Sequence, residues 1–340
     1  MEIEEIVTSV GTAKVVNTKL TFEDKLGALK ARFGINRYNY TVEPGLYAVG
    51  TPDEKSQVLV TANYKLTFDA LRSSLEGLSL WILVIDTKGI NVWCAAGKGT
   101  FGNYEILKVI NKVKLKEIIS HNTIILPQLG APGVAAPVLA RAGFRVVYGP
   151  VRAVDIRKFL NSGLVEDEEM SQVQFNLRDR IVLTPMEFIP GLKYTLPFLI
   201  PILIFNLFLS NNWGTAITIA MANFLPLLAA LVIGTILVPV LLPYIPFRAF
   251  SLKGLFLSML WSVVFYNISD IFLVPGNILV KAAFILFMLF ISSYTALQFT
   301  GSSTYTSLSG TTKETIYSII IGGAACITGL ILLIIYVVMR

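Results

Sequence analysis

Histidine and cysteine are almost absent from this chain of 340 residues, which holds one His and two Cys. The single His121 excludes a multi-histidine metal centre within one chain. Cys94 and Cys326 lie far apart in the sequence, so there is neither a disulfide framework nor a CxxC metal pair. An iron–sulfur cluster held by this chain alone is also excluded, because such clusters need about four thiolates.

Charge is scarce in the C-terminal part of the chain. Residues 191–340 hold six basic and two acidic residues, whereas residues 1–190 hold 22 Lys and Arg and 20 Asp and Glu. The whole chain is 54% hydrophobic with a mean hydropathy of +0.67, which excludes a soluble protein of ordinary composition. The net charge of +6 does not indicate a nucleic-acid surface, because basic and acidic residues alternate in the first half. This split predicts a soluble part and a membrane part.

The membrane part contains apolar runs that are each close to the roughly 20 residues needed to cross a bilayer. We expect an all-α transmembrane domain over 191–340 with about five helices, at 193–210, 214–240, 255–274, 278–298 and 316–338. Arg248 and Lys253 follow the second run, which favours a cytoplasmic N-terminus. The acidic first residues lack the apolar region of a signal peptide. We therefore expect a multi-pass protein of the inner (cytoplasmic) membrane with its N-terminal domain in the cytoplasm.

The first half alternates strand-like apolar runs with helical patterns, which is typical of an α/β fold with a Rossmann-like sheet. The strand-like runs are 58–64, 78–86, 123–126 and 144–148. We expect this domain to cover residues 1–165. Residues 166–190, which include Pro185 and Pro190, are expected to form a linker.

Ligands of α/β sheets bind beyond the carboxyl ends of the strands, so the residues that follow each run are candidates for a binding site. These candidates are Thr61, Ala62, Asn63, Gly130, Gly133, Tyr148 and Gly149. The glycines allow a ligand to approach the backbone closely. For residues 61–64 an ordinary strand-to-helix turn, with Asn in left-handed geometry, is an equally good interpretation.

The rare Cys94 lies after the apolar run 78–86, in a stretch that reads Asn91, Val92, Trp93, Cys94, Ala95, Ala96, Gly97 and Lys98. Three interpretations compete. Cys94 can be a buried structural cysteine. The Gly-Lys pair suggests a phosphate loop, but Val92 and Gly99 stand where that motif requires Gly and Ser or Thr. A reactive or metal-ligating thiolate is the third, favoured by a helix N-terminus and by Lys98 one turn further on.

The stretch from Asn91 to Lys98 resembles the cap-helix motif of the HgcA family of mercury-methylating corrinoid proteins. The resemblance implies a corrinoid-binding domain like that of the corrinoid iron–sulfur proteins of acetyl-CoA metabolism, followed by a membrane domain. It also implies that a cobalamin-type corrinoid is the cofactor and that the Cys94 thiolate is the lower axial ligand of its cobalt. The candidates at 61–63, 130, 133, 148 and 149 would then bind the corrinoid together with residues 91–98.

The function implied by the resemblance is that of an enzyme, a corrinoid-dependent methyltransferase that converts inorganic Hg(II) to methylmercury. Its implied partners are a ferredoxin-like protein with two [4Fe–4S] clusters, as reductant and possible mercury donor, and a methyl donor from folate one-carbon metabolism that acts through a methyltransferase. Membrane lipid is a further partner, and no nucleic acid is expected. One alternative is a membrane-anchored corrinoid methyl carrier of acetyl-CoA or folate metabolism. Another is a membrane sensor or transporter whose soluble domain binds a different ligand.

Overall fold

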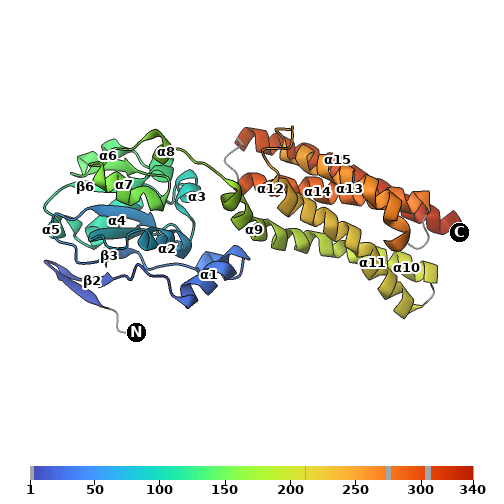
Figure 1. Cartoon of the computed structure of the whole chain (residues 1–340), viewed down its shortest axis with the longest axis horizontal. Helices are drawn as coiled ribbons and strands as arrows, with labels where there is room; N and C mark the ends of the chain where they lie inside the picture. Colours follow the sequence, from blue (N-terminus) through green and yellow to red (C-terminus); the bar gives the residue numbers. More distant parts are fainter. Residues whose placement is uncertain (1–3, 211, 273–276, 303–307, 340) are drawn as a thin grey trace. The chain divides into compact units, whose positions relative to one another are not determined.

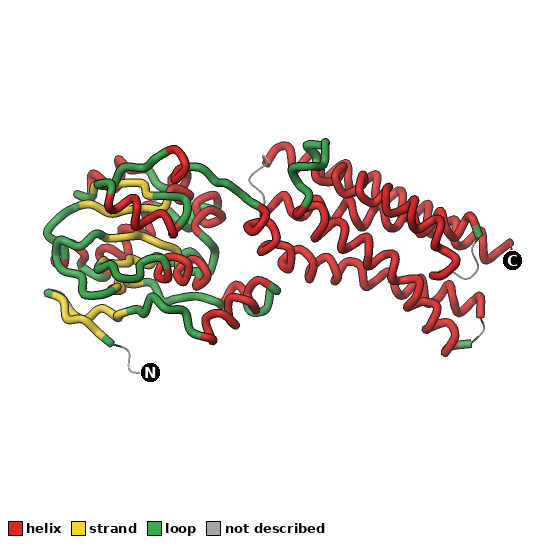
Figure 2. The backbone as a smooth tube through the Cα atoms, viewed as in Figure 1, coloured by secondary structure: helices red, strands yellow, loops and turns green. Residues whose placement is uncertain are grey.

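The computed structural model describes residues 4–210, 212–272, 277–302 and 308–339. The chain divides into two compact units, the α/β unit Met1–Gln174 and the helical unit Phe175–Arg340. The first combines a mixed sheet with helices, and the second consists of helices joined by turns and loops, with no strand among its described residues (Figures 1 and 2). The predicted fold class, an α/β domain followed by an all-α region, is confirmed.

The α/β unit contains a seven-stranded sheet. Its strands are β1 (Glu5–Thr8), β2 (Gly11–Val15), β3 (Gly45–Val49), β4 (Val58–Ala62), β5 (Leu80–Ile85), β6 (Thr123–Pro127) and β7 (Arg145–Gly149). They lie in the order β1-β2-β3-β5-β4-β6-β7. The pairs β5–β4, β4–β6 and β6–β7 are parallel, whereas β3 runs antiparallel to β5. The four parallel strands therefore end at one edge of the sheet.

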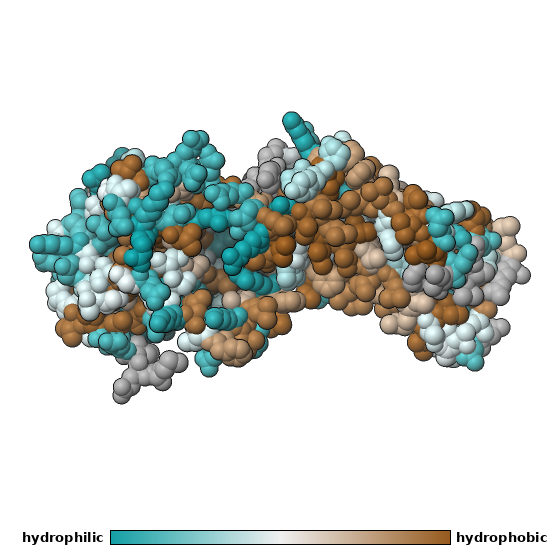
Figure 3. All heavy atoms as spheres, viewed as in Figure 1, coloured by the Kyte–Doolittle hydropathy of each residue, from teal (hydrophilic) through white to brown (hydrophobic). Residues whose placement is uncertain are grey.

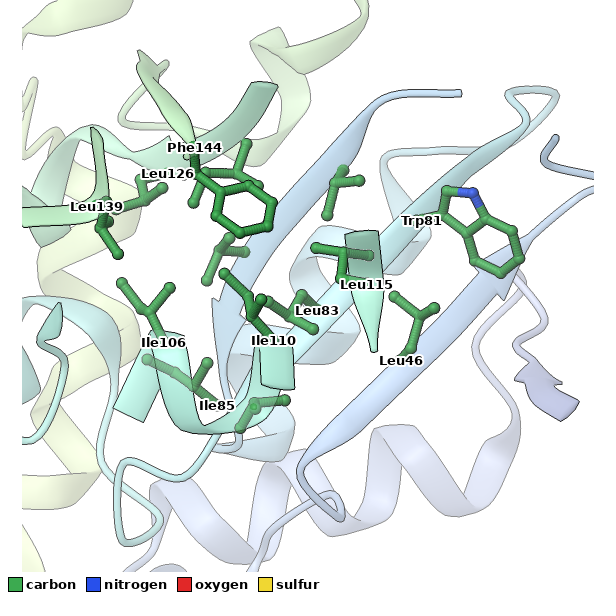
Figure 4. Packing of buried hydrophobic residues seen from close by; sticks show 14 of the residues in the cluster. Leu46, Trp81, Leu83, Ile85, Ile106, Ile110, Leu115, Leu126, Leu139 and Phe144 are labelled. Atoms are coloured by element: carbon green, nitrogen blue, oxygen red, sulfur yellow. The ribbon is translucent and has the colours of Figure 1, made fainter. Parts of the chain in front are cut away.

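Helices cover both faces of the sheet. The short α3 (Val92–Gly97), α4 (Asn103–Lys112), α5 (Leu115–Ile118) and α6 (Ala136–Arg141) pack on one face, and α2 (Lys65–Ser73), α7 (Ile156–Asn161) and α8 (Glu168–Ser171) supply the residues that pack on the other. Figure 4 shows the first layer, in which Leu83 and Ile85 of β5 meet Ile106 and Ile110 of α4. Every residue of β5 is buried, as expected of a strand covered on both sides.

Helix α1 (Phe22–Arg32) is attached to α2 by charged side chains. Lys65 Nζ lies 2.6 Å from Asp24 Oδ1 and 2.7 Å from Asp69 Oδ2. Arg72 contacts the same two carboxylates, each at 2.7 Å. Burial acts to raise the pKa of Asp24, but hydrogen bonds from Lys65, Thr21 and Arg72 outweigh it and hold that pKa well below its ordinary value. Two acids and two bases thus form a neutral, half-buried network.

The helical unit has five helical segments that are long and apolar enough to span a membrane. They are Leu177–Ser210, Trp213–Val240, Phe250–Asp270, Ile278–Gly301 and Gly310–Met339. The segments comprise α9 (Leu177–Thr195), α10 (Leu199–Ser210), α11 (Trp213–Val232), the π-helical turn η5 (Ile233–Leu237), α12 (Val238–Val240), α13 (Phe250–Phe272), α14 (Ile278–Gln298) and α15 (Leu308–Met339). The prediction of five segments is confirmed. Figure 3 shows apolar surface across the middle of this unit.

The first span begins earlier than the sequence analysis expects. Residues 177–190 of the expected linker are helical and belong to α9, with Pro185 and Pro190 inside the helix. Asn176 starts this helix through a capping box, in which its side chain accepts from the Asp179 N–H and the Asp179 carboxylate accepts from the Asn176 N–H. Prolines are tolerated inside such helices when neighbouring groups satisfy the freed carbonyls.

Close contact between helices of this unit depends on glycine. A Cβ on Gly234 would lie 2.0 Å from Thr295 Oγ1, and one on Gly254 would lie 2.4 Å from the Ser292 carbonyl oxygen. The Ser292 hydroxyl donates to the Ala230 carbonyl at 2.7 Å. Small residues and hydroxyls are the usual means of joining helices in a bilayer, where lipid is as apolar as the helix surface.

Two buried cations donate hydrogen bonds to backbone carbonyl groups at the end of the second span and just after it. Arg180 Nη1 donates to the carbonyls of Pro239 and Val240, at 2.9 and 2.7 Å. Lys253 Nζ donates to the carbonyls of Leu242 and Ile245, at 2.9 and 2.7 Å. The two side chains are 7% and 6% exposed. They therefore bind carbonyls that a helix leaves without partners at its C-terminal end.

Candidate functional site

The carboxyl edge of the parallel strands is organised by one buried side chain, Asn63. Its Oδ1 accepts from the backbone N–H groups of Thr87 and Gly89, at 3.0 and 3.1 Å. The Thr87 hydroxyl lies 2.9 Å from the same oxygen and 2.7 Å from the Ile90 carbonyl. Asn63 Nδ2 donates to Asp86 Oδ1 at 3.1 Å. Asn63 thus connects the end of β4 to the loop that follows β5.

That loop leads directly into α3. Gly89 has a φ of +68°, and a Cβ there would lie 2.3 Å from the Tyr38 carbonyl oxygen, so the turn requires glycine. Asn91 is the N-cap of α3 and accepts from the Cys94 N–H at 3.0 Å. The loop and the cap together fix where α3 begins and where Cys94 lies.

The loop after β6 supports α3 from the side. In the short helix η2 (Gln128–Gly133), a Cβ on Gly133 would lie 2.2 Å from the Phe101 carbonyl oxygen and 2.9 Å from Ala96 Cα. A Cβ on Gly130 would lie 2.6 Å from the ring of Phe101, which is fully buried. Both glycines therefore permit close packing of the loop against α3 and Phe101.

Cys94 lies half-exposed on α3, with no disulfide partner among the residues that the structure describes. Trp93 beside it is 37% exposed. Lys98 is exposed and is the C-cap residue of α3. Helix α3 has only six residues, and its Cys94 N–H is already bound by the Asn91 side chain.

The predicted site residues separate into two groups by exposure. The buried ones shape the edge from beneath and are Thr61, Ala62, Asn63, Val92, Ala95, Ala96, Gly130 and Gly149. The exposed or half-exposed ones can meet a ligand directly and are Asn91, Trp93, Cys94, Gly97, Lys98, Gly133 and Tyr148. Tyr148 donates to the Val134 carbonyl at 3.1 Å, and burial raises its pKa. The structure thus brings β4, α3, η2 and β7 together at one edge.

A hollow of about 330 Å³ lies between the loop after β5 and the start of α4. It is lined by Asp86, Lys88, Gly99, Thr100, Gly102, Asn103, Tyr104, Glu105 and Gly133. Burial acts to raise the pKa of Asp86, but hydrogen bonds from the Lys88 side chain and N–H outweigh it and leave that pKa lowered. Its volume is at the small end of ligand-pocket sizes, and Gly133 is the one predicted site residue that lines it.

Sequence reasoning missed Thr87 and Phe101, which hold the loop and α3 in place. Thr87 is fully buried and Phe101 fills the space between Gly130 and α3. The sequence signal for Thr87 was the Lys-Gly pair that follows it, which indicates a tight turn. Both Lys88 and Gly89 have positive φ. Across the described ranges, no three His, Cys, Asp or Glu side chains come together as metal ligands.

Comparison with known proteins matches residues 23–158 to the family described as CO dehydrogenase/acetyl-CoA synthase delta subunit. The gamma subunit of the acetyl-CoA decarbonylase/synthase complex of Methanopyrus kandleri is 35% identical over 131 residues, which are 38% of this chain and 28% of that protein. Gamma subunit 2 of Methanosarcina thermophila is 37% identical over 114 residues, or 32% of this chain and 24% of that protein. The gamma subunit of Archaeoglobus fulgidus is 30% identical over 121 residues, which are 35% of this chain and 26% of that protein.

The chain spans about a quarter of the length of these curated relatives. The matched residues run from α1 to α7 and include β4, Cys94 and η2. The α/β unit is therefore similar, over residues 23–158, to the delta and gamma subunits of CO dehydrogenase/acetyl-CoA synthase complexes.

Proposed function

We propose that the chain is a membrane-anchored corrinoid protein that carries a methyl group and transfers it to inorganic Hg(II), with Cys94 as the lower axial ligand of cobalt. The observation that carries the proposal is the placement of Cys94, half-exposed on a short helix whose position is fixed by Asn63, Asn91 and Gly133. The resemblance of residues 91–98 to mercury-methylating corrinoid proteins supplies the choice of cofactor and acceptor.

The residues on α3 fit a soft metal at this position. Cys94 is half-exposed and, in the part of the chain that the structure describes, it has no disulfide. Thiolate is a soft ligand that binds metals only when deprotonated. A bound methyl corrinoid supplies a methyl group that can leave with its bonding electrons, as an electrophile such as Hg(II) requires.

Each element of the edge then has its own task. Cys94 presents the sulfur, and Asn91 holds the Cys94 backbone through its N–H. Gly133 keeps η2 close to α3, so that the helix cannot shift without moving a neighbouring backbone. Lys98, at the C-terminal end of α3, adds positive charge to this helix, and its exposure to solvent weakens the effect of that charge.

A second candidate function is supported by the comparisons. Residues 23–158 are similar to subunits of complexes named for acetyl-CoA decarbonylation and synthesis. A corrinoid methyl carrier of one-carbon metabolism would bind its cofactor at the same edge, with a carbon-metabolism enzyme as the methyl acceptor. In either case we propose that a separate reductant with iron–sulfur clusters and a folate-linked methyltransferase serve the chain, and that the five spans anchor it with the α/β unit in the cytoplasm.

The test is the cobalt content and the ultraviolet–visible spectrum of the full-length protein after reconstitution with a corrinoid. Wild type is compared with Cys94→Ala and with Cys326→Ala, which removes the other cysteine and serves as the matched control. We expect the spectrum to change in Cys94→Ala and to stay as in wild type in Cys326→Ala. Corrinoid that binds with the same spectrum in all three proteins would contradict Cys94 as the ligand.

The acceptor is tested by single-turnover transfer from the methylated protein to Hg(II). We expect wild type and Cys326→Ala to form methylmercury and Cys94→Ala to form none. Bound corrinoid without transfer to Hg(II), but with transfer to an acetyl-CoA synthase, would favour the second candidate. Failure to retain cobalt at all would leave the α/β unit with a different ligand, as in a membrane sensor or transporter.

A further inference from the structure

Helix α1 has two faces with opposite roles. Asp24, Gly27 and Ala31 lie on the face that packs against the rest of the α/β unit. Ala31 is fully buried, and a Cβ on Gly27 would lie 2.5 Å from the Tyr40 hydroxyl. Asp24 joins the network with Lys65 and Arg72.

The opposite face carries the large apolar side chains of the helix. Phe22, Leu26, Leu29 and Phe33 are spaced at four, three and four residues, so they form one stripe roughly 60° wide at about 100° per residue. All four are exposed, with Phe22 at 78% and Leu29 at 52%. Amphipathic helices usually bury such a stripe in their own domain. Here the stripe points away from the residues that pack.

This orientation is held by the charged network. Turning the stripe inward would withdraw Asp24 from Lys65 and Arg72, which contact it at 2.6 and 2.7 Å. It would also place the aromatic and leucine side chains where only Gly27 and Ala31 now fit. The exposed stripe is therefore a built feature of the α/β unit.

Further apolar residues extend the stripe beyond the helix. Ile35 and Tyr38 follow the turn at Gly34 and are 58% and 75% exposed. Tyr is common at membrane–water interfaces, where its ring meets lipid and its hydroxyl meets water. Exposed apolar residues that gather in this way usually mark an interaction surface.

Basic residues border the stripe on both sides. On the helical projection Lys25 and Arg32 lie beside one edge, and Lys30 lies beside the other edge together with the exposed Glu23 of the first turn. A helix with an apolar stripe bordered by Lys and Arg is the pattern of helices that lie in the plane of an anionic membrane surface. Long basic side chains can reach lipid headgroups while their stems cover apolar surface.

The α/β unit is joined to the first candidate span by a short stretch of chain. Met170 is buried in the core of the α/β unit, and its carbonyl accepts from the Val151 N–H at 2.9 Å. Leu177, only seven positions later, begins the first candidate span. Seven residues extend at most roughly 25 Å. A membrane that holds the helical unit therefore lies near the α/β unit.

We propose that α1 is a membrane-surface helix, whose stripe of Phe22, Leu26, Leu29 and Phe33 enters the interface of an anionic bilayer. The proposal goes beyond methyl transfer and requires only that the helical unit is membrane-embedded. Lys25, Lys30 and Arg32 bind the headgroups. Two observations favour a bilayer over a partner protein: the basic residues beside the stripe and the short chain before the first candidate span.

The test uses the full-length protein in nanodiscs of mixed phosphatidylcholine and phosphatidylglycerol. An environment-sensitive fluorophore is attached to Leu29→Cys, in a background where Cys94 and Cys326 are replaced by Ala. Val154→Cys is the matched control, because Val154 is an exposed apolar residue of the same unit, 69% exposed and outside α1. Ile327→Cys, exposed on the fifth candidate span, reports membrane insertion itself. Phe22→Cys gives a second position on the stripe.

We expect doxyl-labelled lipid to quench the fluorophore at positions 29, 22 and 327 at least about twofold more than at 154. Quenching at 29 should weaken when phosphatidylglycerol is omitted. Quenching at 327 without quenching at 29 and 22 would overturn the proposal while leaving the anchor intact. A blue-shifted emission at 29 that doxyl lipid does not quench would show that protein covers the stripe, and would also overturn it. Absence of quenching at 327 would reject the membrane anchor and the proposal together.

Discussion

The side-chain oxygen of Asn63 lies 3.0 Å from the backbone nitrogen of Thr87, and this bond joins two loops at the carboxyl edge of the sheet. The same oxygen binds the Gly89 N–H, and all three residues are buried. Asn63→Ala would leave two buried N–H groups without an acceptor, each at a cost of about 1–3 kcal/mol. We expect a loss of about 3 kcal/mol in unfolding free energy.

Chemical or thermal unfolding of the detergent-solubilised protein measures this loss. Asn111→Ala, at an exposed position of α4, is the control and should stay within about 0.5 kcal/mol of wild type. A similarly small effect for Asn63→Ala would mean that water replaces its side-chain oxygen.

Gly133 tests whether η2 fixes the position of α3. Gly133→Ala places a Cβ 2.2 Å from the Phe101 carbonyl oxygen, so a backbone segment must move. Overpacking of this kind costs about 1–3 kcal/mol. We expect lower thermal stability together with a faster rate of Cys94 alkylation, because α3 is displaced. Gly45→Ala, where a Cβ meets nothing within 4 Å, should change neither quantity.

Asp24 gives a prediction about pH. Its pKa is lowered in the folded protein, so its charge stabilises the attachment of α1 at neutral pH, and this stabilisation is lost as the pH falls through the lowered pKa. Asp24→Asn should therefore increase hydrogen exchange of the α1 amides at pH 7, by an amount that corresponds to about 1–3 kcal/mol. The difference from wild type should shrink as the pH falls below about 4.

The control for that experiment is Glu23→Gln in the same exposed turn of α1, which lies outside the network. Equal exchange in Asp24→Asn and wild type at pH 7 would show that apolar contacts alone hold α1.

Lys253 gives a prediction for the helical unit. Its ammonium binds the carbonyls of Leu242 and Ile245, so Lys253→Met leaves both acceptors without this donor. We expect the unfolding free energy of the helical unit to fall by about 2–4 kcal/mol. Arg248→Gln changes an exposed cation of the same connection and should have little effect. Equal melting of the two variants would show that water satisfies these carbonyls.

Much of the fold was predictable because apolar runs report buried strands and spans directly. The run at 78–86 became β5, and the five apolar segments became five candidate spans. The antiparallel placement of β3 beside β5 was not predictable, because periodicity carries no information on strand order. The early start of the first span was hidden by the charges of Arg178, Asp179 and Arg180, of which Arg180 binds carbonyls inside the unit.

The candidate site was predictable in part. Spacing indicated that 61–63, 91–98 and 130–133 would meet at one edge, as they do. Sequence alone did not distinguish residues that face a ligand from those that position others. Asn63 was expected to touch a ligand, but its oxygen is occupied by Thr87 and Gly89. That distinction depends on side-chain direction, which only the folded backbone determines.

The close approach of Gly133 to Ala96 has a consequence for protein engineering. Residues 91–98 form a compact motif in the sequence, yet their geometry is set by Asn63, Thr87 and Gly133 from other parts of the chain. If these eight residues were grafted onto a foreign scaffold, the Cys94 sulfur would be present but its position would no longer be fixed. A transplant that works must bring three distant supports with it, so the smallest portable unit is the whole sheet edge.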